Sequence, residues 1–268
     1  MRMQDKIVVL IGAGQSPGQG IGNGRAAATL YVREGAKVLA VDSNLQSAEQ
    51  TVQEVGAGGD SCVAFAGDAT READMAAAIG FALDRWGRVD VLHYNVGVSL
   101  AGGDSKLEEF TEEAFDRVSA INLRGYIMAV KHVLPSMRER RSGAIVAISS
   151  IAALSTVYPN VAYKTSKAGM IAFTEQVARQ NAEYGIRANV ILPGLLDTPM
   201  AVDTRVRKWG QPRSEVVAMR DAKVPLRHKM GTAWDSAWAA LFLASDEAQF
   251  ITGVSLPVDG GGLLRAGD

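Results

Sequence analysis

The chain has 268 residues, of which 47% are hydrophobic and 21% charged, and its 28 basic and 29 acidic residues leave a formal net charge of -1. A chain of this length can bury a sizeable core, and α/β folds of this size commonly form one domain, so a single domain over residues 1–268 is predicted. The charge balance lacks the basic face that nucleic acid or an anionic membrane surface requires. The one cysteine, Cys62, excludes an intrachain disulfide, and the three histidines lack metal-ligand spacing, so no metal site is expected.

The chain shows no targeting or membrane segment. Its first dozen residues lack the basic-then-apolar layout of a signal peptide. No apolar run approaches the roughly 18 residues that a membrane-spanning helix needs. A cytoplasmic protein without a membrane partner is therefore predicted.

Short apolar runs alternate along the chain with segments of helical periodicity, such as the segment that holds Ala27, Leu30 and Tyr31. The apolar runs are nearly continuous, which is typical of strands covered on both faces. This alternation predicts βαβ crossovers and a doubly wound α/β fold, with a parallel sheet of about seven strands and helices on both faces. The strands are expected at residues 7–11, 37–42, 61–66, 89–94, 144–149, 187–192 and 254–258.

A glycine-rich turn at residues 12–24 joins the first predicted strand to a helix that begins near Arg25. Such a turn lets the backbone approach a phosphate, and the helix N-terminus adds free N–H groups and the positive end of its dipole. Asp42 ends the next strand, close to the ~20-residue offset at which a carboxylate binds a ribose diol. Because the glycine turn lies on the neighbouring strand, ribose binding is favoured over a role for Asp42 in capping the next helix.

The glycine turn and Asp42 also indicate which nucleotide cofactor is bound. The Asp42 carboxylate would repel a 2′-phosphate, and Ser43 and Asn44 supply no cation, so NAD is predicted over NADP. A kinase-type phosphate loop is excluded because Arg25 follows Gly24 where that loop requires lysine. A methyltransferase that binds S-adenosylmethionine can also pair a glycine-rich turn with an acidic strand end, and it stays open on these residues alone.

Tyr163 and Lys167 lie four residues apart on a predicted helix and therefore share one face. A phenol with a pKa near ~10 is a poor base at neutral pH. A nearby cation lowers that pKa and makes proton exchange with an alcohol feasible. Such a pair is common on solvated helix faces, but Ser150 ends an apolar strand at the edge where parallel sheets bind their ligands. A catalytic role is therefore favoured.

At these residues the chain resembles the classical short-chain dehydrogenase/reductase family, through Ser149-Ser150 and the motif Tyr-x-x-Ser-Lys-Ala-Gly that begins at Tyr163. The resemblance extends from Gly12 to Gly262 and implies a Rossmann-type fold. It implies that Ser150, Tyr163 and Lys167 are catalytic, and that Asn122 holds a water in a proton relay rather than facing solvent. The expected cofactor-binding residues are Gly12, Gly22, Asn23, Gly24, Asp42, Asp68, Ala69, Asn95, Gly97, Tyr163, Lys167, Pro193, Gly194 and Thr198.

The chain departs from the family pattern in three places. The glycine turn carries extra residues between Gly12 and Gly22, so which glycines contact the pyrophosphate is left open. His93-Tyr94 precedes Asn95 where the family prefers another asparagine before it, so a contact that stabilises this strand is expected to differ. The segment 200–231 matches no particular substrate group of the family. The family also implies a homotetramer, with which the apolar stripes around Tyr126 and Phe173 and the segment 256–264 are compatible.

The matched set predicts an NAD-dependent oxidoreductase that interconverts a secondary alcohol and a ketone. Tyr163 would act as acid and base, Ser150 would orient the substrate oxygen, and Lys167 would lower the pKa of Tyr163 and bind the nicotinamide ribose. A methyltransferase explains neither the tyrosine motif nor the C-terminal Val-Asp-Gly-Gly. Two alternatives remain. The first is a 3-oxoacyl reductase of lipid metabolism, which normally favours NADPH against the argument from Asp42. The second is a non-catalytic NAD-binding scaffold, which needs no acid or base.

Residues 200–231 are rich in charge, Trp and Met, and are predicted to form an inserted lid or substrate loop. Their basic residues are interpreted as a solvated face, with a phosphate-bearing or acyl-carrier substrate as the alternative; they are Arg205, Arg207, Lys208 and Arg213. The side chains expected near the substrate lack Arg and Lys, which predicts a small neutral alcohol or ketone. These pocket residues, each of which could equally be core, are Leu100, Ala153, Leu154, Tyr158, Met200 and Trp209.

Overall fold

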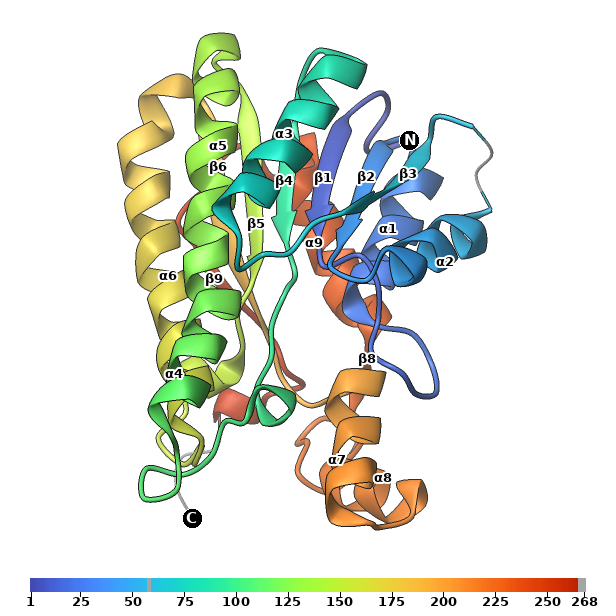
Figure 1. Ribbon diagram of the computed structural model, residues 1–268, viewed down its shortest axis with the longest axis vertical. Coiled ribbons are helices and arrows are strands. Elements are labelled where there is room, and N and C mark those ends of the chain that lie inside the picture. The colour runs from blue at the N-terminus through green and yellow to red at the C-terminus, as the bar shows by residue number, and fades with distance from the viewer. Residues whose placement is uncertain (57–58, 265–268) are drawn as a thin grey trace.

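A computed structural model describes residues 1–56 and 59–264 (Figure 1). Seven parallel strands form one sheet in the order β3-β2-β1-β4-β5-β6-β9. Each strand lies where an apolar run predicted it, and the doubly wound α/β fold is confirmed. The strands are β1 (Ile7–Ile11), β2 (Lys37–Asp42), β3 (Cys62–Ala66), β4 (Val91–Tyr94), β5 (Gly143–Ile148), β6 (Ile186–Pro193) and β9 (Ser255–Val258).

Helices cover both faces of the sheet. Figure 1 shows α3, α5 and α6 on one face and α1, α2 and α9 on the other. Along the described part of the chain, no helix is both long and apolar enough to cross a lipid bilayer. The helices are α1 (Asn23–Arg33), α2 (Leu45–Val55), α3 (Glu72–Trp86), α4 (Glu112–Ser119), α5 (Gly125–Arg140), α6 (Val161–Asn181), α7 (Thr204–Trp209), α8 (Arg213–Asp221) and α9 (Ala233–Ala244).

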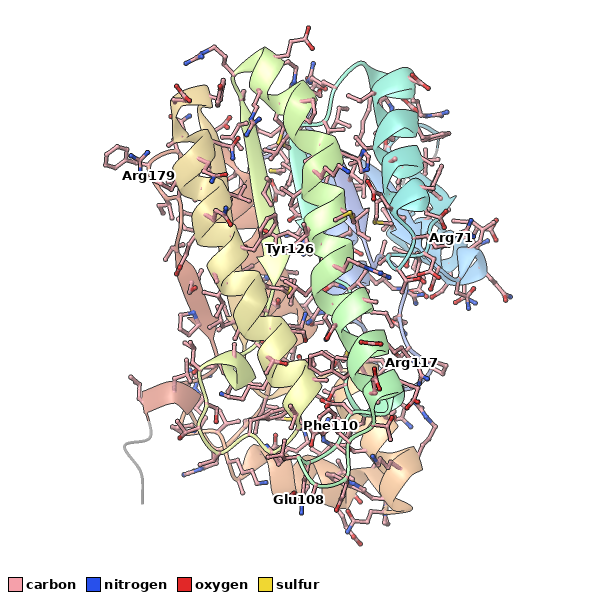
Figure 2. The ribbon with its side chains drawn as sticks, turned by 60° about the vertical axis from the view of Figure 1, so that its left-hand side comes forward. Arg71, Glu108, Phe110, Arg117, Tyr126 and Arg179 are labelled. Atoms are coloured by element: carbon pink, nitrogen blue, oxygen red, sulfur yellow. The ribbon has the colours of Figure 1, made fainter. Side chains whose placement is uncertain are left out.

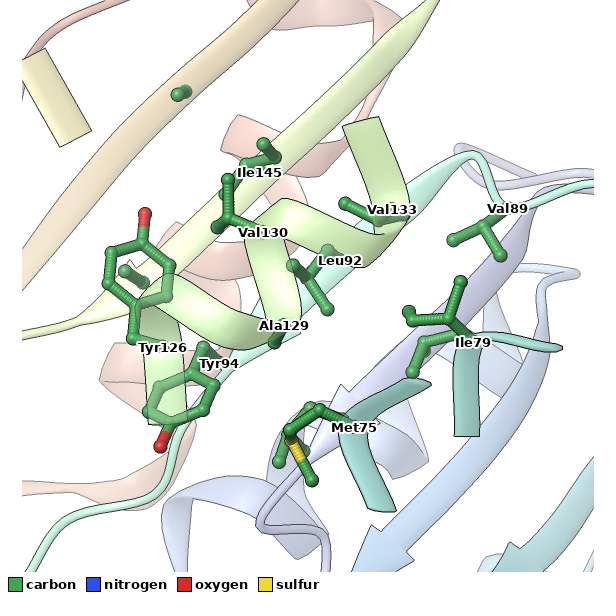
Figure 3. Close-up of a cluster of buried hydrophobic side chains, with 14 of the residues drawn as sticks. Met75, Ile79, Val89, Leu92, Tyr94, Tyr126, Ala129, Val130, Val133 and Ile145 are labelled. Atoms are coloured by element: carbon green, nitrogen blue, oxygen red, sulfur yellow. The ribbon is translucent and has the colours of Figure 1, made fainter. Parts of the chain in front are cut away.

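Two apolar layers sandwich the sheet, and strand β1 contributes to both. Val9 and Ile11 pack in the layer under α3, α5 and α6, whereas Val8 and Leu10 pack in the layer under α1 and α9. Successive strand side chains point to opposite faces, so a strand covered on both sides needs an unbroken apolar run. Figure 3 shows the first layer, in which Ile79 of α3 lies near side chains of α5 and β4.

Helices α5 and α6 run side by side (Figure 2). Tyr126 of α5 bonds through its hydroxyl to Thr174 of α6 at 2.8 Å, and its ring meets Phe173 edge-on at a centroid distance of 5.4 Å. Tyr126 has no exposed surface. The interpretation of Tyr126 as part of an apolar stripe for subunit contact is therefore wrong, because the side chain lies in the core of its own chain.

The segment 200–231 is predominantly helical rather than a plain loop. Helices α7 and α8 pack around a small apolar cluster that includes Val202, Val216 and Met230. A two-stranded parallel sheet, β7 (Leu196–Asp197) with β8 (Gly231–Thr232), joins the two ends of the segment. In Figure 1 the two helices lie together below the large sheet, so the segment forms a small folded unit.

His93 supplies a contact between β4 and α1. Its Nδ1 lies 2.9 Å from the hydroxyl of Tyr31, and Nε2 has no hydrogen-bond partner among the described residues. The side chain is 1% exposed. Burial lowers the pKa of His93 to about 3, because the charged imidazolium would lose its hydration.

This burial gives the fold an acid-sensitive component. Unfolded histidine titrates near ~6.5, so the stability due to neutral His93 is fully present above that pH and is lost as pH falls towards 3. We expect His93→Gln to flatten the pH dependence of the unfolding free energy in urea by up to ~1.4 kcal/mol per pH unit between these limits. His132→Gln, which changes a partly exposed histidine, should keep the slope. An unchanged slope in the His93 variant would contradict this assignment.

Candidate active site

A cavity of about 530 Å³ opens at the carboxyl ends of the strands. Strand β1 pairs with β2 on one side and with β4 on the other, so the chain changes direction across the sheet at β1. Doubly wound sheets bind ligands at such a switch point. The segments after the central strands and the unit formed by α7 and α8 supply the cavity walls, and the volume is in the range of small-molecule sites.

The cavity brings together nearly all of the site residues predicted from the sequence. Asn122 is the one predicted residue that does not line its wall. The predicted residues on the wall are Gly12, Gly22, Asn23, Gly24, Asp42, Asp68, Ala69, Asn95, Gly97, Ser150, Tyr163, Lys167, Pro193, Gly194 and Thr198.

The long glycine turn divides into a part that lines the cavity and a part that does not. Gly12, Gly14, Gly22 and Gly24 are on the wall, and Gly18 is not. Gly12 has a φ of +85°, which favours glycine. A Cβ on Gly24 would lie 2.0 Å from the carbonyl oxygen of Gly12, so only glycine allows α1 to start this close to β1.

The extra residues of the turn lie against the segment 200–231. Arg207 donates a hydrogen bond to the carbonyl oxygen of Pro17 at 2.9 Å. A Cβ on Gly18 would meet the carboxylate of Asp203. The insertion thus contacts the helical unit beneath the sheet and leaves the remaining glycines free to line the cavity.

Asp42 lies half-buried in the wall at the end of β2. Its carboxylate accepts hydrogen bonds from the backbone N–H groups of Gly14 and Asn44, both at 3.0 Å. Asn44 itself caps α2 by accepting from the N–H of Ser47. The alternative that Asp42 is the cap of this helix is therefore wrong, and Asp42 is left at the cavity with an orienting contact to the glycine turn.

Asn23 and Asn95 lie at the glycine turn and bear on whether this end of the cavity can bind a dinucleotide. The amide Oδ1 of Asn23, at the start of α1, is buried without a partner in the described structure. Asn95 donates from Nδ2 to the carbonyl oxygen of Gly12 at 2.8 Å, which fixes the glycine turn from the next strand. A glycine-lined wall, a helix N-terminus and an acidic strand end fit an adenine dinucleotide.

Asp68 lines the cavity and also stabilises the loop in which it lies. Its Oδ1 accepts from the backbone N–H and the hydroxyl of Thr70, at 2.8 and 2.9 Å. These bonds order the turn after β3, next to Ala69 on the wall. At the other side of the cavity, Thr198 uses its hydroxyl to accept from the N–H of Ala201.

Ser150, Tyr163 and Lys167 meet at the opposite end of the cavity from the turn after β3 that Asp68 orders. The Ser150 hydroxyl lies near the Tyr163 phenol on the cavity wall and lowers the pKa of that phenol. The Lys167 ammonium donates to the carbonyl oxygen of Ile148 at 2.7 Å and lies 5.8 Å from the centroid of the Tyr163 ring. Ser149 donates to the carbonyl oxygen of Lys167 at 2.8 Å, so helix α6 is held on the end of β5.

In the protein without cofactor, burial is the main cause of the pKa shifts of Tyr163 and Lys167. The pKa of Tyr163 is raised to about 12, mainly by burial and also by Tyr158, whereas Ser150 and Arg205 lower it. Burial lowers the pKa of Lys167 to about 7. The sequence predicted a lowered pKa for Tyr163. In the protein without cofactor the shift has the opposite direction, because burial of the phenol has the largest effect.

Asn122 is buried in a π-helical turn (Ala120–Arg124) between α4 and α5. Its Oδ1 accepts from the N–H of Val98 at 2.8 Å, and its Nδ2 donates to the carbonyl oxygen of Val98 and to Ser166. The solvent-facing alternative is therefore wrong. Asn122 ties the segment after β4 to helix α6, and its part in a water relay stays a prediction.

The chain is similar to known proteins over nearly its whole length. A family model described as "Enoyl-(Acyl carrier protein) reductase" matches residues 15–262. The 2-(R)-hydroxypropyl-CoM dehydrogenase of Xanthobacter autotrophicus is 34% identical over 91% of this chain and 95% of its own length. A solved structure from Burkholderia xenovorans, assigned to the short-chain dehydrogenases/reductases, matches with a TM-score of 0.91 at 38% identity over 99% of both chains. This chain belongs to the short-chain dehydrogenase/reductase family.

A second relative, levodione reductase, is similar to this chain in both sequence and structure. Levodione reductase of Leifsonia aquatica is 31% identical over 97% of this chain and 95% of its own length. A solved structure of levodione reductase matches with a TM-score of 0.91 at 30% identity, over 98% of this chain and all of the other. The protein is therefore an oxidoreductase of the short-chain dehydrogenase/reductase family.

The substrate end of this short-chain dehydrogenase/reductase differs from its sequence-based prediction. Leu100, Tyr158 and Met200 line the cavity as predicted. The prediction is wrong for three residues that are not on the wall: Ala153, Leu154 and Trp209. Two cations do line it, Arg205 and Arg220. The interpretation of Arg205 as part of a solvated face is thus wrong, and Arg220 was missed because it lies 15 residues further along the chain, on α8.

Asp104 is a second residue that the sequence analysis did not predict. It lies in the segment after β4, has no exposed surface, and accepts hydrogen bonds from the N–H groups of Ala162 and Tyr163, both at 3.0 Å. Asn160, at the cap position of α6, makes no side-chain capping bond. Asp104 therefore caps helix α6 from a segment distant in sequence.

Removing this cap should leave two buried N–H groups without partners. We expect Asp104→Ala to lower the unfolding free energy by about 1–3 kcal/mol, measured by urea denaturation. Asp116→Ala, which changes an exposed aspartate on α4, should have little effect. Equal stabilities of the two variants would show that Asp104 does not hold the start of α6.

Proposed function

We propose that this protein is an NAD-dependent oxidoreductase that interconverts a secondary alcohol and a ketone. The observation that carries the proposal is that Ser150, Tyr163 and Lys167 line the same cavity as Asp42 and the glycine turn. The names of two relatives, a hydroxypropyl-CoM dehydrogenase and a levodione reductase, support an alcohol or ketone as substrate. A non-catalytic scaffold would have no need of a buried acid and base at this place.

In the proposed reaction the substrate oxygen lies between the Ser150 hydroxyl and the Tyr163 phenol, which line the same cavity. Tyr163 takes the hydroxyl proton during oxidation and returns it during reduction, as a general base and acid. NAD, when bound, supplies a ring that accepts hydride from the alcohol carbon and a positive charge that lowers the pKa of a neighbouring phenol. Lys167, held by Ile148, lies beneath Tyr163 and supplies a proton donor at this end of the cavity.

The preference for NAD over NADP rests on the charges at the two ends of the cavity. Asp42 is the acidic residue at the end of β2, and its neighbours Ser43 and Asn44 are uncharged. Among the described residues of the wall, the cations are Lys167, Arg205 and Arg220. These three belong to the catalytic end, so nothing positive offsets the repulsion of a 2′-phosphate by Asp42.

Several broader features remain predictions. We propose one dinucleotide-binding and catalytic domain over residues 1–268, of which 57–58 and 265–268 lie outside the described residues, with residues 200–231 as its lid. A homotetramer and a cytoplasmic location are retained from the sequence. The edge strand β9, with exposed Phe250 before it and exposed Leu264 after it, supports a subunit contact there.

Replacing the proposed acid and base should remove turnover without removing the cofactor site. We expect Tyr163→Phe to lower kcat by roughly 100- to 10,000-fold for secondary alcohols, measured as formation of reduced NAD. Its affinity for NAD, measured by calorimetry, should change little. Tyr184→Phe, away from the cavity wall, is the matched control. Turnover that survives in the Tyr163 variant would exclude this residue as the acid and base.

Replacing Asp42 should weaken discrimination between the two cofactors. In Asp42→Ala we expect kcat/KM to fall with NAD and to rise with NADP, because both the contact to the ribose and the repulsion are lost. Asp84→Ala, at an exposed position of α3, should leave the ratio unchanged. The assignment is overturned if the unmodified enzyme already works better with NADP.

A further inference from the structure

Arg205 and Arg220 extend from different helices of the segment 200–231 to the wall of the catalytic cavity. Arg205 lies on α7 and Arg220 on α8, and the apolar cluster around Val202, Val216 and Met230 holds the two helices together. The proximity of each guanidinium to the other lowers the pKa of Arg220, after the larger effect of burial. Two like charges therefore share one part of the cavity.

Neither guanidinium forms an ion pair in the described structure. Arg205 donates to the carbonyl oxygen of Ala201 at 2.6 Å. Arg220, which is 6% exposed, donates to the sulfur of Met230 at 3.2 Å and to the carbonyl oxygen of Leu196 at 3.5 Å. Buried charges in proteins are costly unless they are paired. These neutral partners leave most of the ten N–H donors of the two groups without a protein acceptor.

The nearest acidic side chains are engaged elsewhere. Asp197 forms an ion pair with Arg213, and Asp221 accepts from the backbone N–H of Met230 at 2.8 Å. The other basic residues of the segment also differ from the pair in the cavity. Arg207 bonds to the glycine turn, and Lys208 is exposed and off the wall. An anion bound in the cavity would supply the negative charge that Asp197 and Asp221 do not.

The position of the pair separates it from the proposed cofactor end. Arg205 lies close enough to both Tyr158 and Tyr163 to lower the pKa of each phenol, and Arg220 does the same for Tyr158. The ring of Tyr158 is 5.7 Å from that of Tyr163. The two guanidinium groups thus face the space beside the proposed acid and base rather than Asp42.

We propose that the substrate of this site is an anionic secondary alcohol or ketone, whose carboxylate or phosphate group is bound by Arg205 and Arg220 while its hydroxyl or carbonyl oxygen lies at Ser150 and Tyr163. The proposal rests on the oxidoreductase function proposed above and replaces the small neutral substrate predicted from the sequence. Guanidinium groups bind both oxyanions through paired, charge-assisted hydrogen bonds. The apolar wall residues Leu100 and Met200 would cover the carbon chain between the two ends.

The kinetic test compares substrates of equal length that differ in charge. Secondary hydroxy carboxylates of increasing chain length are assayed with NAD beside their neutral amides and beside the corresponding hydroxy phosphate esters. We expect kcat/KM for the best anion to exceed that of its neutral match by at least about tenfold, the effect of one charge-assisted hydrogen bond. The preferred oxyanion identifies the source of the charge. Equal kcat/KM for anionic and neutral alcohols would overturn the proposal and leave the oxidoreductase function standing.

Variants assign the effect to the two residues. Arg205→Met and Arg220→Met should each lower kcat/KM for the anion by about tenfold or more and change it little for the neutral alcohol. A variant that merely misfolds would lose both activities. Arg220→Lys, which keeps the charge of the buried residue, should recover part of the preference. Lys208→Met, on the same helix as Arg205 but off the wall, is the matched control. A preference unchanged in both arginine variants would overturn the assignment.

A binding measurement separates this proposal from the function on which it rests. Calorimetry with butyrate and with inorganic phosphate needs no turnover. If no alcohol reduces NAD but either anion binds and the Arg205→Met variant does not bind it, the oxyanion site stands and the oxidoreductase proposal fails. If neither anion binds the unmodified protein, the oxyanion site is excluded.

Discussion

The site depends on one buried cation and the backbone that holds it. Lys167 is 2% exposed, and its ammonium is fixed by the carbonyl oxygen at the end of β5. Because this side chain leaves helix α6 one turn after Tyr163, the bond to Ile148 sets where the phenol stands above the sheet. Ser149, the residue after Ile148, and Asp104, in the segment after β4, hold the same helix. The first turns of this long helix are thereby fixed by contacts that come from two parts of the chain.

The strand order of the sheet places two different groups of residues at opposite ends of one cavity. The strand order around β1 brings the glycine turn, Asp42 and Asn95 to the same edge as Ser150. One end then has a carboxylate and backbone N–H groups, and the other has a phenol with three cations. The charges of the two ends are opposite. The acidic end suits the ribose hydroxyls of NAD, which can donate hydrogen bonds to a carboxylate, and the basic end attracts an oxyanion.

Much of this could be predicted because the relevant signals are local. Apolar runs located the seven strands, and a four-residue spacing placed Tyr163 and Lys167 on one face of a helix. Residues that act across the chain left no such signal. Asp104 caps a helix that begins far from it in sequence. Tyr126 was predicted to belong to an apolar surface stripe, but it packs against α6 and bonds to Thr174. Arg205 was also predicted to be solvated. Its position on the cavity wall depends on the packing of α7 against α8, which the sequence pattern does not show.

We propose that Tyr163 is a half-buried phenol that releases its proton only when NAD is bound. The direct measurement is the ultraviolet difference absorbance of phenolate, recorded against pH for the unmodified protein and for Tyr163→Phe, each with and without NAD. In the protein without cofactor the pKa of Tyr163 is raised to about 12, mainly by burial. We expect no phenolate from this residue at a pH of about 9 in the protein alone, and a clear signal when NAD is bound. The same absorbance with and without NAD would contradict the account.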